Sequence, residues 1–386
     1  MELIENNENL KKICAKLANE PFICVDLEFM RQHTYFARLC LIQIASQNDA
    51  VIIDPLAEGI VLDVFFDLMQ NPDIVKVFHS GRQDIEIIYN LSNKVPFPVF
   101  DTQIAASAAG YGESVSYENL VSNILHKNID KSSRLSDWSK RPLNKNQLIY
   151  ALSDVTHLVH IYQYLKTWLT EQNRIEWIND ELQNLCNENL YKISPHEIWQ
   201  KMRHRSHNAK YLTLLRELAA WREIRAINKN VPRQSFIKDD LLLNICAECP
   251  QNKDDLMSVR GMRTDLATGK IGDEIIEVVQ KTKLLDESDY VTPPPVYNFS
   301  NTDQGLLELL KLLLRIIALE NMIIPKLIAD EDDLKHFCNG NTVDIPFLSG
   351  WRYELFGLAA QKMKNGNTAI SYDSQKHRLK FTDLSE

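Results

Sequence analysis

Two carboxylates stand one residue apart at the end of a short apolar run. Asp26 and Glu28 follow FICV within the segment VDLEF. Because alternate side chains of a strand lie on the same face, both carboxylates should point towards one place. They repel each other there unless a cation lies between them, and oxygen ligands of this type suit Mg²⁺ or Mn²⁺. The pair predicts a metal site, with a surface charge pair or a turn as the alternative.

Two further acids and a tyrosine occur where the same site can use them. Asp84 lies early in a helical pattern after the apolar run IVKVF, so its carboxylate can point back over a sheet edge. Tyr150 and Asp154 are four residues apart in another helical pattern, which places the phenol and the carboxylate on one face. The alternatives are a favourable charge at a helix N-terminus, a core aromatic and a solvated helix residue.

The elements that must position these residues alternate between strand and helix patterns. Short runs rich in Val, Ile and Leu predict strands: FICVDLEF, LCLIQIA, AVIID and IVKVFH. Helical periodicity marks SGRQDIEIIYNLS and NKNQLIYALSDVTHLVHIYQYLKTWL. The first three strands follow one another closely, which favours an antiparallel meander entering a mixed sheet over a doubly wound fold. We expect an α/β domain over residues 1–195.

The second half of the chain has helical patterns. A long helix is predicted for NAKYLTLLRELAAWREIRAINKN, ended by Pro232, and another for IKDDLLLNICAEC before Pro250. These helices predict a bundle over residues 203–288. The row VTPPPVYN contains three consecutive prolines, which predict an extended linker over residues 289–299. A second all-helical bundle is expected over residues 300–386.

Length and composition point to an intracellular globular protein. A chain of 386 residues with 45% hydrophobic residues can form two or three domains. The start, MELIENNENLKK, lacks the features of a secretory signal, and the apolar stretch from Leu306 carries Glu308 and Lys311, so neither export nor a membrane span is expected. Seven scattered cysteines suit a reduced, cytoplasmic protein, and the lone CxxC of Cys246 and Cys249 has no partner pair for zinc. No heptad seam is evident, so a monomer is expected.

The net charge of −9 hides two basic rows. Nine Lys or Arg residues lie between Lys201 and Arg233 against two glutamates, and the row from Lys131 to Lys145 contains Asp137 as its only acid. Phosphates respond to the local field, so the two rows together favour a polyanionic partner over ordinary solvated helix faces. Six side chains are candidates to follow a nucleic-acid backbone: Lys201, Arg203, Arg205, Arg222, Arg225 and Arg233. Docking on the acidic first domain is the competing use.

The order and spacing of the five site residues resemble the DEDDy family of 3′→5′ exonucleases. Asp26 and Glu28 match the D-x-E motif, Asp84 matches the helical aspartate, and Tyr150 with Asp154 matches Y-x-x-x-D. The similarity to the exoribonucleases of the family covers most of residues 20–165, in VDLEFMRQHTYFARLCLIQIA, FHSGRQDIEIIYN, DTQIAA and DKSSRLSDWSKRPLNKNQLIYALSDVTHL. LRELAAWREIRAINKNVPR is similar to an HRDC domain, and NMIIPKLIADEDDL with SGWRYELFG resembles a second, divergent HRDC-like domain.

The resemblance implies a ribonuclease H-like exonuclease domain with two bound divalent metal ions, Mg²⁺ or Mn²⁺. In the family, the positions of Asp26 and Asp154 hold the metal associated with the attacking water, and those of Asp26, Glu28 and Asp84 help to place the second metal. Two metals can stabilise the attacking and the leaving oxygen of an in-line displacement. Tyr150 should orient the water, since a phenol with a pKa of about 10 is a poor base at neutral pH.

The implied activity is trimming of the 3′ ends of tRNA precursors and other structured RNAs, with release of nucleoside 5′-monophosphates. Two alternatives stay open on the residues alone. A DNA-directed exonuclease is one alternative, since such enzymes use the same carboxylates. No residue of the sequence is identified that would contact the 2′-hydroxyl and so distinguish RNA from DNA. A catalytically inactive nucleic-acid-binding scaffold is of another class, and the intact set of five residues argues against it.

Candidate substrate contacts lie beside the motifs. Phe29 and Met30 follow the D-x-E pair, where the family packs residues against the terminal nucleotide, and core packing is their alternative. Trp138 has the same two readings. Arg141 can contact a phosphate or pair locally with an acid. His79 is interpreted as a structural histidine, since no neighbour has zinc-ligand spacing.

Overall fold

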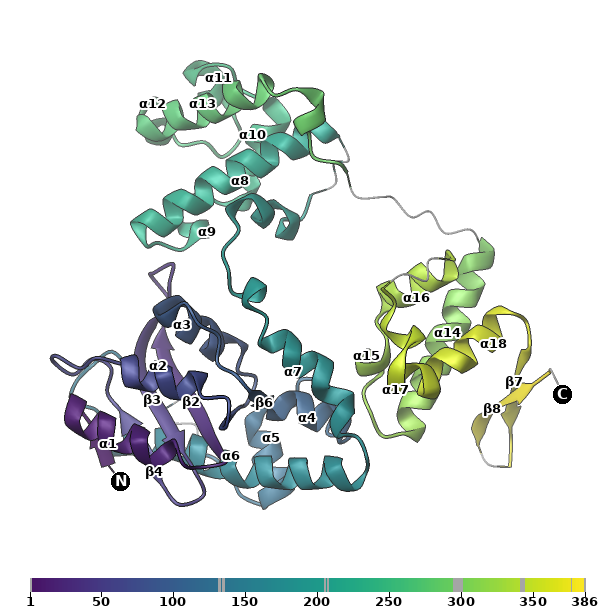
Figure 1. Cartoon of the computed structure of the whole chain (residues 1–386). Coiled ribbons are helices and arrows are strands. Elements are labelled where there is room, and N and C mark those ends of the chain that lie inside the picture. Colours follow the sequence, from purple (N-terminus) through teal and green to yellow (C-terminus); the bar gives the residue numbers. More distant parts are fainter. Residues whose placement is uncertain are drawn as a thin grey trace. The chain divides into compact units, whose positions relative to one another are not determined.

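The computed structural model describes residues 2–130, 133, 136–204, 206, 208–293, 301–340, 344–375 and 377–384 (Figure 1). Its contacts divide the chain into two units. The first comprises Met1–Glu28, Leu41–Leu190 and Tyr297–Glu386, and the second comprises Phe29–Cys40 and Tyr191–Val296. Arg205 and most of the predicted proline-rich linker, from residue 294 on, lie outside the described residues, as do Lys131 and Arg134 of the second basic row.

The first unit contains a six-stranded mixed sheet, as predicted. Its order is β1 (Glu2–Ile4), β4 (Ala50–Ile53), β3 (Arg38–Ala45), β2 (Phe22–Met30), β5 (Val75–Phe78) and β6 (Val99–Asp101). β3 pairs antiparallel with β4, while β1 with β4, β2 with β5 and β5 with β6 are parallel pairs. The apolar runs of the sequence predicted the four longer strands but not β1 and β6, which have three residues each.

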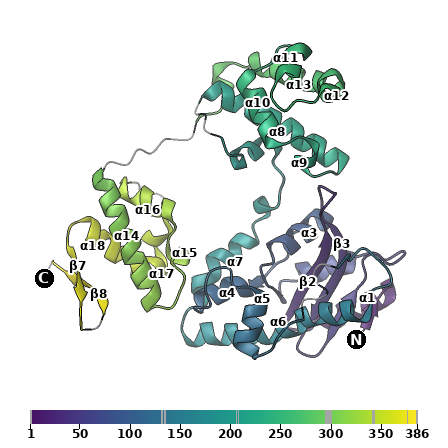
Figure 2. The same ribbon diagram turned by 180° about the vertical axis from the view of Figure 1, so that it is seen from behind.

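Helices border this sheet. They are α1 (Asn7–Leu17), α2 (Asp63–Gln70), α3 (Arg82–Ser92), α4 (Thr102–Ala108), α5 (Tyr117–Leu120), the π-helix η1 (Val121–Leu125) and α6 (Lys145–Glu171), followed by η2 (Ile175–Ile178), α7 (Asn179–Leu185) and η3 (Glu188–Leu190). The long helix α6 runs beside the central strands of the sheet (Figure 2). Its residues Val155, Leu158 and Val159 pack into one core with Cys24 of β2 and Val77 of β5. One face of the central strands therefore faces α6.

The second unit is a helical bundle with a core of its own. Its elements are η4 (Pro195–Lys201), α8 (Ala209–Lys229), α9 (Arg233–Phe236), α10 (Asp239–Glu248), α11 (Lys253–Ser258), α12 (Thr264–Thr268), α13 (Lys270–Lys283) and η5 (Glu287–Asp289). Leu215 and Leu218 of α8 are buried against Leu242 of α10 and Val279 of α13. The helices that the apolar spacing predicts at α8 and α10 are present.

The chain segment between β2 and β3 belongs to this second unit. The Tyr35 hydroxyl donates to the buried carboxylate of Glu223 on α8, which also pairs with Arg233 at 2.8 Å. The main-chain N–H groups of Tyr35 and Phe36 donate to Asn230 Oδ1 at 3.0 and 3.2 Å. Two side chains of the bundle, Glu223 and Asn230, thus hold a segment that is more than 150 residues away along the chain.

The C-terminal region packs within the first unit. It consists of α14 (Asn301–Glu320), α15 (Pro325–Ile328), α16 (Glu331–Cys338), η6 (Pro346–Leu348), α17 (Gly350–Arg352), η7 (Tyr353–Gly357), α18 (Leu358–Lys364), β7 (Thr368–Asp373) and β8 (Arg378–Asp383). Arg352 donates to Asp180 and Glu181, both at 2.6 Å. Trp351 stacks on Trp177 with ring centroids 4.6 Å apart.

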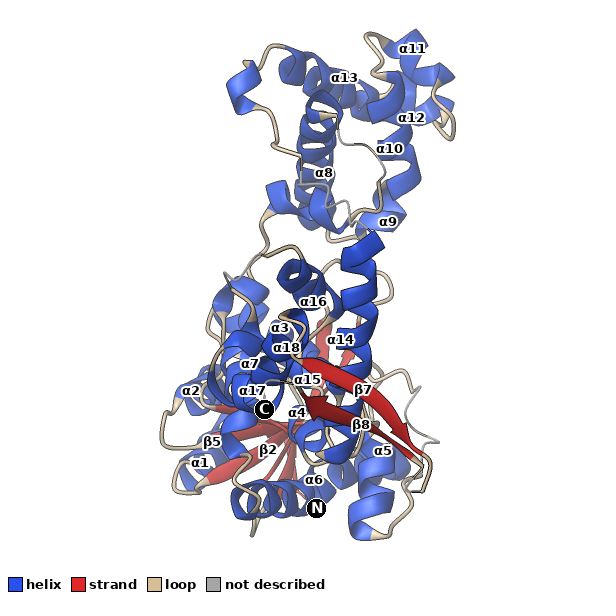
Figure 3. Ribbon diagram, turned by 90° about the vertical axis from the view of Figure 1, so that its right-hand side faces the viewer, coloured by secondary structure: helices blue, strands red, loops and turns tan. Residues whose placement is uncertain are grey.

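The prediction that this region is entirely helical is wrong at its end. β7 and β8 form an antiparallel hairpin, drawn in red in Figure 3. Ile370 lies opposite Phe381 in this hairpin, and both side chains pack against the core of the preceding helices. The alternation of apolar and polar residues in TAISYD and RLKFTD is the strand pattern that the helical interpretation overlooked.

Two features bear on the expectations from composition. Among the residues that the structure describes, no helix is both long enough and apolar enough to cross a membrane. The seven cysteines, all of them within those residues, have free thiols. Burial raises the pKa of the Cys246 thiol in the CxxC pair.

Candidate active site

Strand β2 delivers the first two carboxylates. Cys24, Asp26 and Glu28 alternate along the strand, and Cys24 packs into the core formed with α6. Asp26 and Glu28 therefore share the face that α6 covers. Carboxylate oxygens of Asp26, Glu28 and Asp154 all lie within 4.8 Å of one another. The structure thus brings the predicted D-x-E pair together with the aspartate of the predicted Y-x-x-x-D motif.

Helix α6 has a defined start that sets the positions of its two site residues. The Asn144 side chain accepts from the N–H of Gln147 at 2.9 Å, and the Gln147 side chain accepts from the N–H of Asn144 at 3.0 Å. This capping box satisfies donors at the helix N-terminus. Tyr150 then lies one turn before Asp154 and hydrogen-bonds to its side chain. The predicted pairing of phenol and carboxylate on one face is present.

Asp84 occupies the first turn of α3, which follows β5. Asp84 is 9% exposed, and its burial, followed by the nearby charge of Asp26, raises its pKa. Among the described residues, the three carboxylates within 4.8 Å of one another do not include Asp84. It therefore lies within electrostatic reach of the cluster without sharing its closest contacts.

Burial and mutual repulsion hold protons on the cluster. Burial is the largest cause that raises the pKa of Asp26 to about 7 and that of Asp154 to about 8, and the charge of Asp26 adds to the shift at Asp154. The same two causes raise the pKa of Asp84 well above its ordinary value. A divalent cation removes this repulsion, and three carboxylates at this spacing are hard oxygen ligands of the kind that Mg²⁺ and Mn²⁺ take. The residues present fit a divalent metal.

These pKa values predict how stability depends on pH. Carboxyls of the unfolded chain titrate near 4, so between about pH 4 and pH 8 the metal-free native state binds more protons than the unfolded state. The Tm of the metal-free protein should therefore fall as pH rises through this window. Metal binding requires the deprotonated carboxylates. The increase in Tm caused by millimolar Mg²⁺ should therefore be larger at pH 8 than at pH 6.

Thermal melts with EDTA or Mg²⁺ across this range measure both effects. Asp154→Asn removes one of the shifted groups and should flatten the dependence on pH. A metal-induced change in Tm that is the same at pH 6 and pH 8 in the wild-type protein would contradict the assignment.

The phenol of Tyr150 is neutral at physiological pH. Burial, followed by the charges of Asp154, Glu28 and Asp26, raises its pKa above the ordinary value. The neutral hydroxyl can donate or accept a hydrogen bond and so orient a water. Trp138 lies beside it, with ring centroids 6.1 Å apart.

Tyr117 is a neighbour of the site that no sequence motif predicted. Its hydroxyl donates to the main-chain carbonyl of Asp154, and its ring packs against His79 with centroids 5.3 Å apart. His79 is paired with the Thr102 hydroxyl at 3.0 Å, which agrees with a structural histidine. No motif spacing connects Tyr117 to Asp154, so only the fold reveals the contact.

The predicted substrate contacts fall into different environments. Phe29 and Met30 are half-buried at the end of β2. Trp138 is 2% exposed, as a core residue is. Arg141 forms a two-pronged ion pair with the buried Asp54, one of its bonds measuring 2.6 Å, and donates to the carbonyl of Trp138. Of the two readings for Arg141, the structure shows local pairing with an acid.

Arg222 and Arg225 do not form an open basic surface. The Arg222 side chain is fully buried in the second unit, where it bonds to Asp239 at 2.6 Å and to the carbonyl of Ile237 at 2.9 Å. Arg225 forms a two-pronged pair with Glu274. The expectation that Arg222 follows an RNA backbone is wrong. Its guanidinium lies in the core, where Asp239 and the carbonyl of Ile237 accept its hydrogen bonds.

Arg222→Met should therefore act on stability. We expect a loss of about 2–3 kcal/mol in the free energy of unfolding, because a hydrogen bond to a charged group is lost and a buried carbonyl loses its donor. Urea denaturation of the variant measures this loss. The Kd for single-stranded RNA, measured under conditions where the variant is folded, should stay within about twofold of the wild-type value, as expected of a residue without phosphate contacts. A large loss of affinity at wild-type stability would restore the RNA-binding role.

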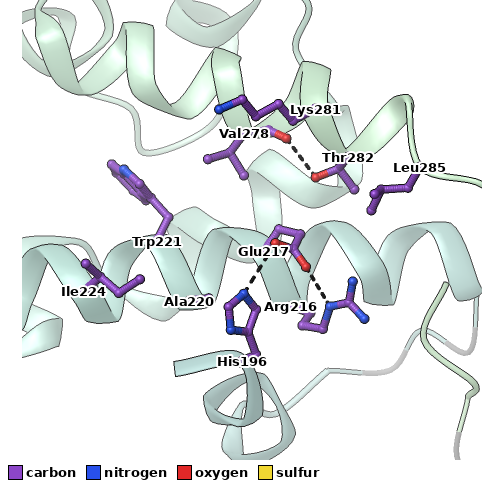
Figure 4. Close-up of a pocket in the computed structure, with 10 residues that line it drawn as sticks. All are labelled: His196, Arg216, Glu217, Ala220, Trp221, Ile224, Val278, Lys281, Thr282 and Leu285. Carbon is purple, nitrogen blue, oxygen red and sulfur yellow. Dashed lines mark hydrogen bonds and ion pairs between the residues drawn. The ribbon is translucent and has the colours of Figure 1, made fainter. Parts of the chain in front are cut away.

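A cavity of about 340 Å³ lies on the bundle of the second unit, lined by η4, α8 and α13 (Figure 4). Glu217 lies between two other side chains of the lining, 2.7 Å from Arg216 and 3.7 Å from His196. Trp221 donates its indole N–H to Glu274 at 3.0 Å. Arg216, His196 and Trp221 are each paired with a glutamate, so we assign no nucleic-acid contact to the cavity.

Comparisons with known proteins agree with this geometry. A 3′-5′ exonuclease family model matches residues 1–170, and an HRDC domain model matches residues 212–279. The ribonuclease D of Acidiphilium cryptum is 39% identical over 99% of this chain and 97% of its own length. That of Bartonella henselae is 40% identical over 98% of this chain and 94% of its own length. The crystal structure of Escherichia coli RNase D shares the fold, with a TM-score of 0.81 at 24% identity over 95% of this chain and 98% of that one.

Proposed function

The chain belongs to the ribonuclease D family and is a 3′→5′ exoribonuclease, and from this premise we propose that it trims tRNA precursors and other structured RNAs from single-stranded 3′ ends. Each turn of the reaction would release a nucleoside 5′-monophosphate. The observation that carries this proposal is the convergence of Asp26, Glu28 and Asp154 within 4.8 Å beside the phenol of Tyr150. An inactive RNA-binding scaffold needs none of these four side chains.

Exonucleases of this superfamily use divalent metal ions, and we propose two here, Mg²⁺ or Mn²⁺. Asp26, Glu28 and Asp154 would hold them, with Asp84 completing the set from α3. When bound, the metals supply positive charge to the attacking and leaving oxygens of the displacement. Asp26 lies between the other carboxylates in the electrostatic network, since its charge acts on both Asp84 and Asp154. This supports a shared ligand role for Asp26.

Tyr150 is proposed to orient the attacking water. The neutral hydroxyl is tied to Asp154, so a water held at the cluster has a fixed hydrogen-bonding partner on α6. Orientation of a nucleophile lowers the barrier because the ordering is achieved before the reaction. Phe29 and Met30 follow directly from the carboxylates along β2 and are proposed to pack against the terminal nucleotide.

We further propose that the protein acts as a cytoplasmic monomer in which the helical bundle of the second unit extends the RNA footprint. Lys201 and Arg203 are exposed there and offer phosphate contacts that should weaken with salt. The boundaries proposed for the domains remain residues 1–195, 203–288 and 300–386, joined by the linker over 289–299.

Product analysis tests the function. A 5′-labelled RNA with a structured body and a single-stranded 3′ tail is incubated with Mg²⁺, with Mn²⁺ or with EDTA, beside a DNA of the same sequence. We expect a ladder that shortens from the 3′ end with either metal, none with EDTA, little on DNA, and mononucleotide 5′-phosphates as the products. RNA that is bound but stays intact with both metals would favour the scaffold instead, and equal shortening of DNA would remove the RNA preference.

A further inference from the structure

Asp101 is a buried acid that the proposed reaction does not use. It ends β6, is 2% exposed, and its carboxylate accepts from four main-chain N–H groups. Gln103 and Ile104 donate to Oδ1 at 2.8 and 3.3 Å, while Ser80 donates to Oδ1 at 3.1 Å and Gly81 to Oδ2 at 2.8 Å. The first two bonds cap α4, as a helix N-cap requires. The bonds to Ser80 and Gly81 are additional.

These additional bonds hold a turn with little freedom. Ser80 has a φ of 57°, in the left-handed region that residues other than glycine rarely adopt. Gly81 has no room for a side chain, because a Cβ there would lie 2.3 Å from Cβ of Phe78. Thr102, next to Asp101, donates to the carbonyl of Phe78 at 3.1 Å and pairs with His79. Asp101 thus binds the turn before α3, and Thr102 binds the end of β5 and the residue that follows it.

The turn leads directly to a proposed metal ligand. α3 begins at Arg82, and Asp84 lies in its first turn, three residues after Gly81. Gly81 occupies the N-cap position of α3 and has no side chain that caps the helix. Asp101, from a neighbouring strand, instead accepts from the N–H groups of Ser80 and Gly81, the two residues that directly precede α3. A change in this tether moves the first turn of α3 and with it the carboxylate of Asp84.

We propose that Asp101 is a positioning residue for Asp84. Its carboxylate fixes the Ser80–Gly81 turn to the end of β6, so that the first turn of α3 presents Asp84 to Asp26 and Asp154. The role of Asp101 is indirect, because its oxygens are used on main-chain N–H groups. This inference rests on the proposed metal cluster. Measurement of the wild-type enzyme in parallel distinguishes a failure of the inference from a failure of the cluster.

Asp101→Asn tests the tether with little change in shape. Oδ1 accepts three of the four bonds, so the amide oxygen should stay there and keep α4 capped. The amide NH₂ would then face the N–H of Gly81, and two donors repel. Asp101→Ser is the second variant, because serine also caps a helix but is too short to reach both sides. Asp330→Asn is the matched control, since Asp330 caps α16 through the N–H of Asp333.

Two readouts are measured on the full chain, namely Mn²⁺ binding by titration calorimetry and single-turnover cleavage of RNA as a function of Mn²⁺ concentration. Residues that orient metal ligands typically change affinity or activity by about 10- to 100-fold when mutated. We expect Mn²⁺ binding weakened to this extent in both Asp101 variants, with a cleavage midpoint shifted to higher Mn²⁺, RNA affinity within about twofold, and wild-type behaviour of Asp330→Asn.

Wild-type Mn²⁺ binding and cleavage in a folded Asp101→Asn would overturn the proposal and leave Asp101 as a cap of α4. So would a loss of the native circular dichroism spectrum in both variants, because Asp101 would then hold the whole domain rather than one helix. If the wild-type protein neither binds Mn²⁺ nor cleaves RNA, the proposed metal cluster itself is wrong. That result differs from an active wild-type protein whose Asp101 variants behave like it, which contradicts only the role of Asp101.

Discussion

Asp26→Ala should reduce cleavage by at least about 10³-fold, since metal ions contribute several kcal/mol to such reactions and each 1.4 kcal/mol is a factor of ten. Asp26 is the acid whose charge acts on both Asp84 and Asp154, so its loss removes a ligand shared by the cluster. Single-turnover cleavage of a 5′-labelled RNA at saturating Mg²⁺ measures the effect. Calorimetric titration with Mn²⁺ should show weakened binding in the same variant.

Asp332→Ala is the matched control for this substitution. Asp332 is separated by one residue from Asp330, as Asp26 is from Glu28, but its side chain is 79% exposed on α16. Its removal should leave cleavage and Mn²⁺ binding unchanged. The assignment of Asp26 fails if a folded Asp26→Ala cleaves RNA at a rate within tenfold of the wild type at the same Mg²⁺ concentration.

Tyr150→Phe should lower the single-turnover rate by about 10²–10³-fold, within the range that a positioned proton donor or acceptor contributes. The ring is kept, so its packing beside Trp138 is retained and only the hydroxyl bonded to Asp154 is lost. Mn²⁺ binding and RNA affinity should both stay close to wild type. The effect is therefore expected in the chemical step alone.

Tyr372→Phe serves as the control for Tyr150→Phe. Tyr372 lies on β7, is 61% exposed and bonds to His377 at 3.3 Å, so the same loss of a hydroxyl occurs far from any carboxylate of the cluster in sequence. A rate unchanged by Tyr150→Phe would remove the orienting role. A rate that falls together with Mn²⁺ affinity would mean that the phenol organises Asp154 rather than the water.

The sequence predicted the parts of the fold whose patterns are long enough to be specific. Apolar runs of four or more residues identified β2, β3, β4 and β5, and helical spacing identified α3, α6, α8 and α10. β1 and β6 have three residues each, which is too short for a period to show. They are strands because the existing sheet offers them paired neighbours. At the C-terminus, the preceding helices led to a helical expectation that the alternation in β7 and β8 contradicts.

Spacing predicted two pairs of site residues, and the family resemblance joined them. D-x-E on a strand places Asp26 beside Glu28, and Y-x-x-x-D on a helix places Tyr150 beside Asp154. The residues that support the site were not predicted. Asp101 and Tyr117 act through main-chain groups on other elements, and such contacts leave no periodic pattern. Arg222 was misjudged for a related reason, because the charge of a residue does not reveal whether an acid elsewhere in the chain allows it to be buried.

The discontinuity of the second unit limits how this protein can be dissected. Because Phe29–Cys40 belongs to the same unit as Tyr191–Val296, one proteolytic cut near Leu190 does not divide the chain into two self-sufficient fragments. The N-terminal fragment would expose Tyr35 and the main-chain donors that Asn230 satisfies, and the C-terminal fragment would retain Glu223 without that partner. Excision of either part therefore requires redesign of the β2–β3 connection, and the order of synthesis means that this connection emerges from the ribosome long before the helix that completes it.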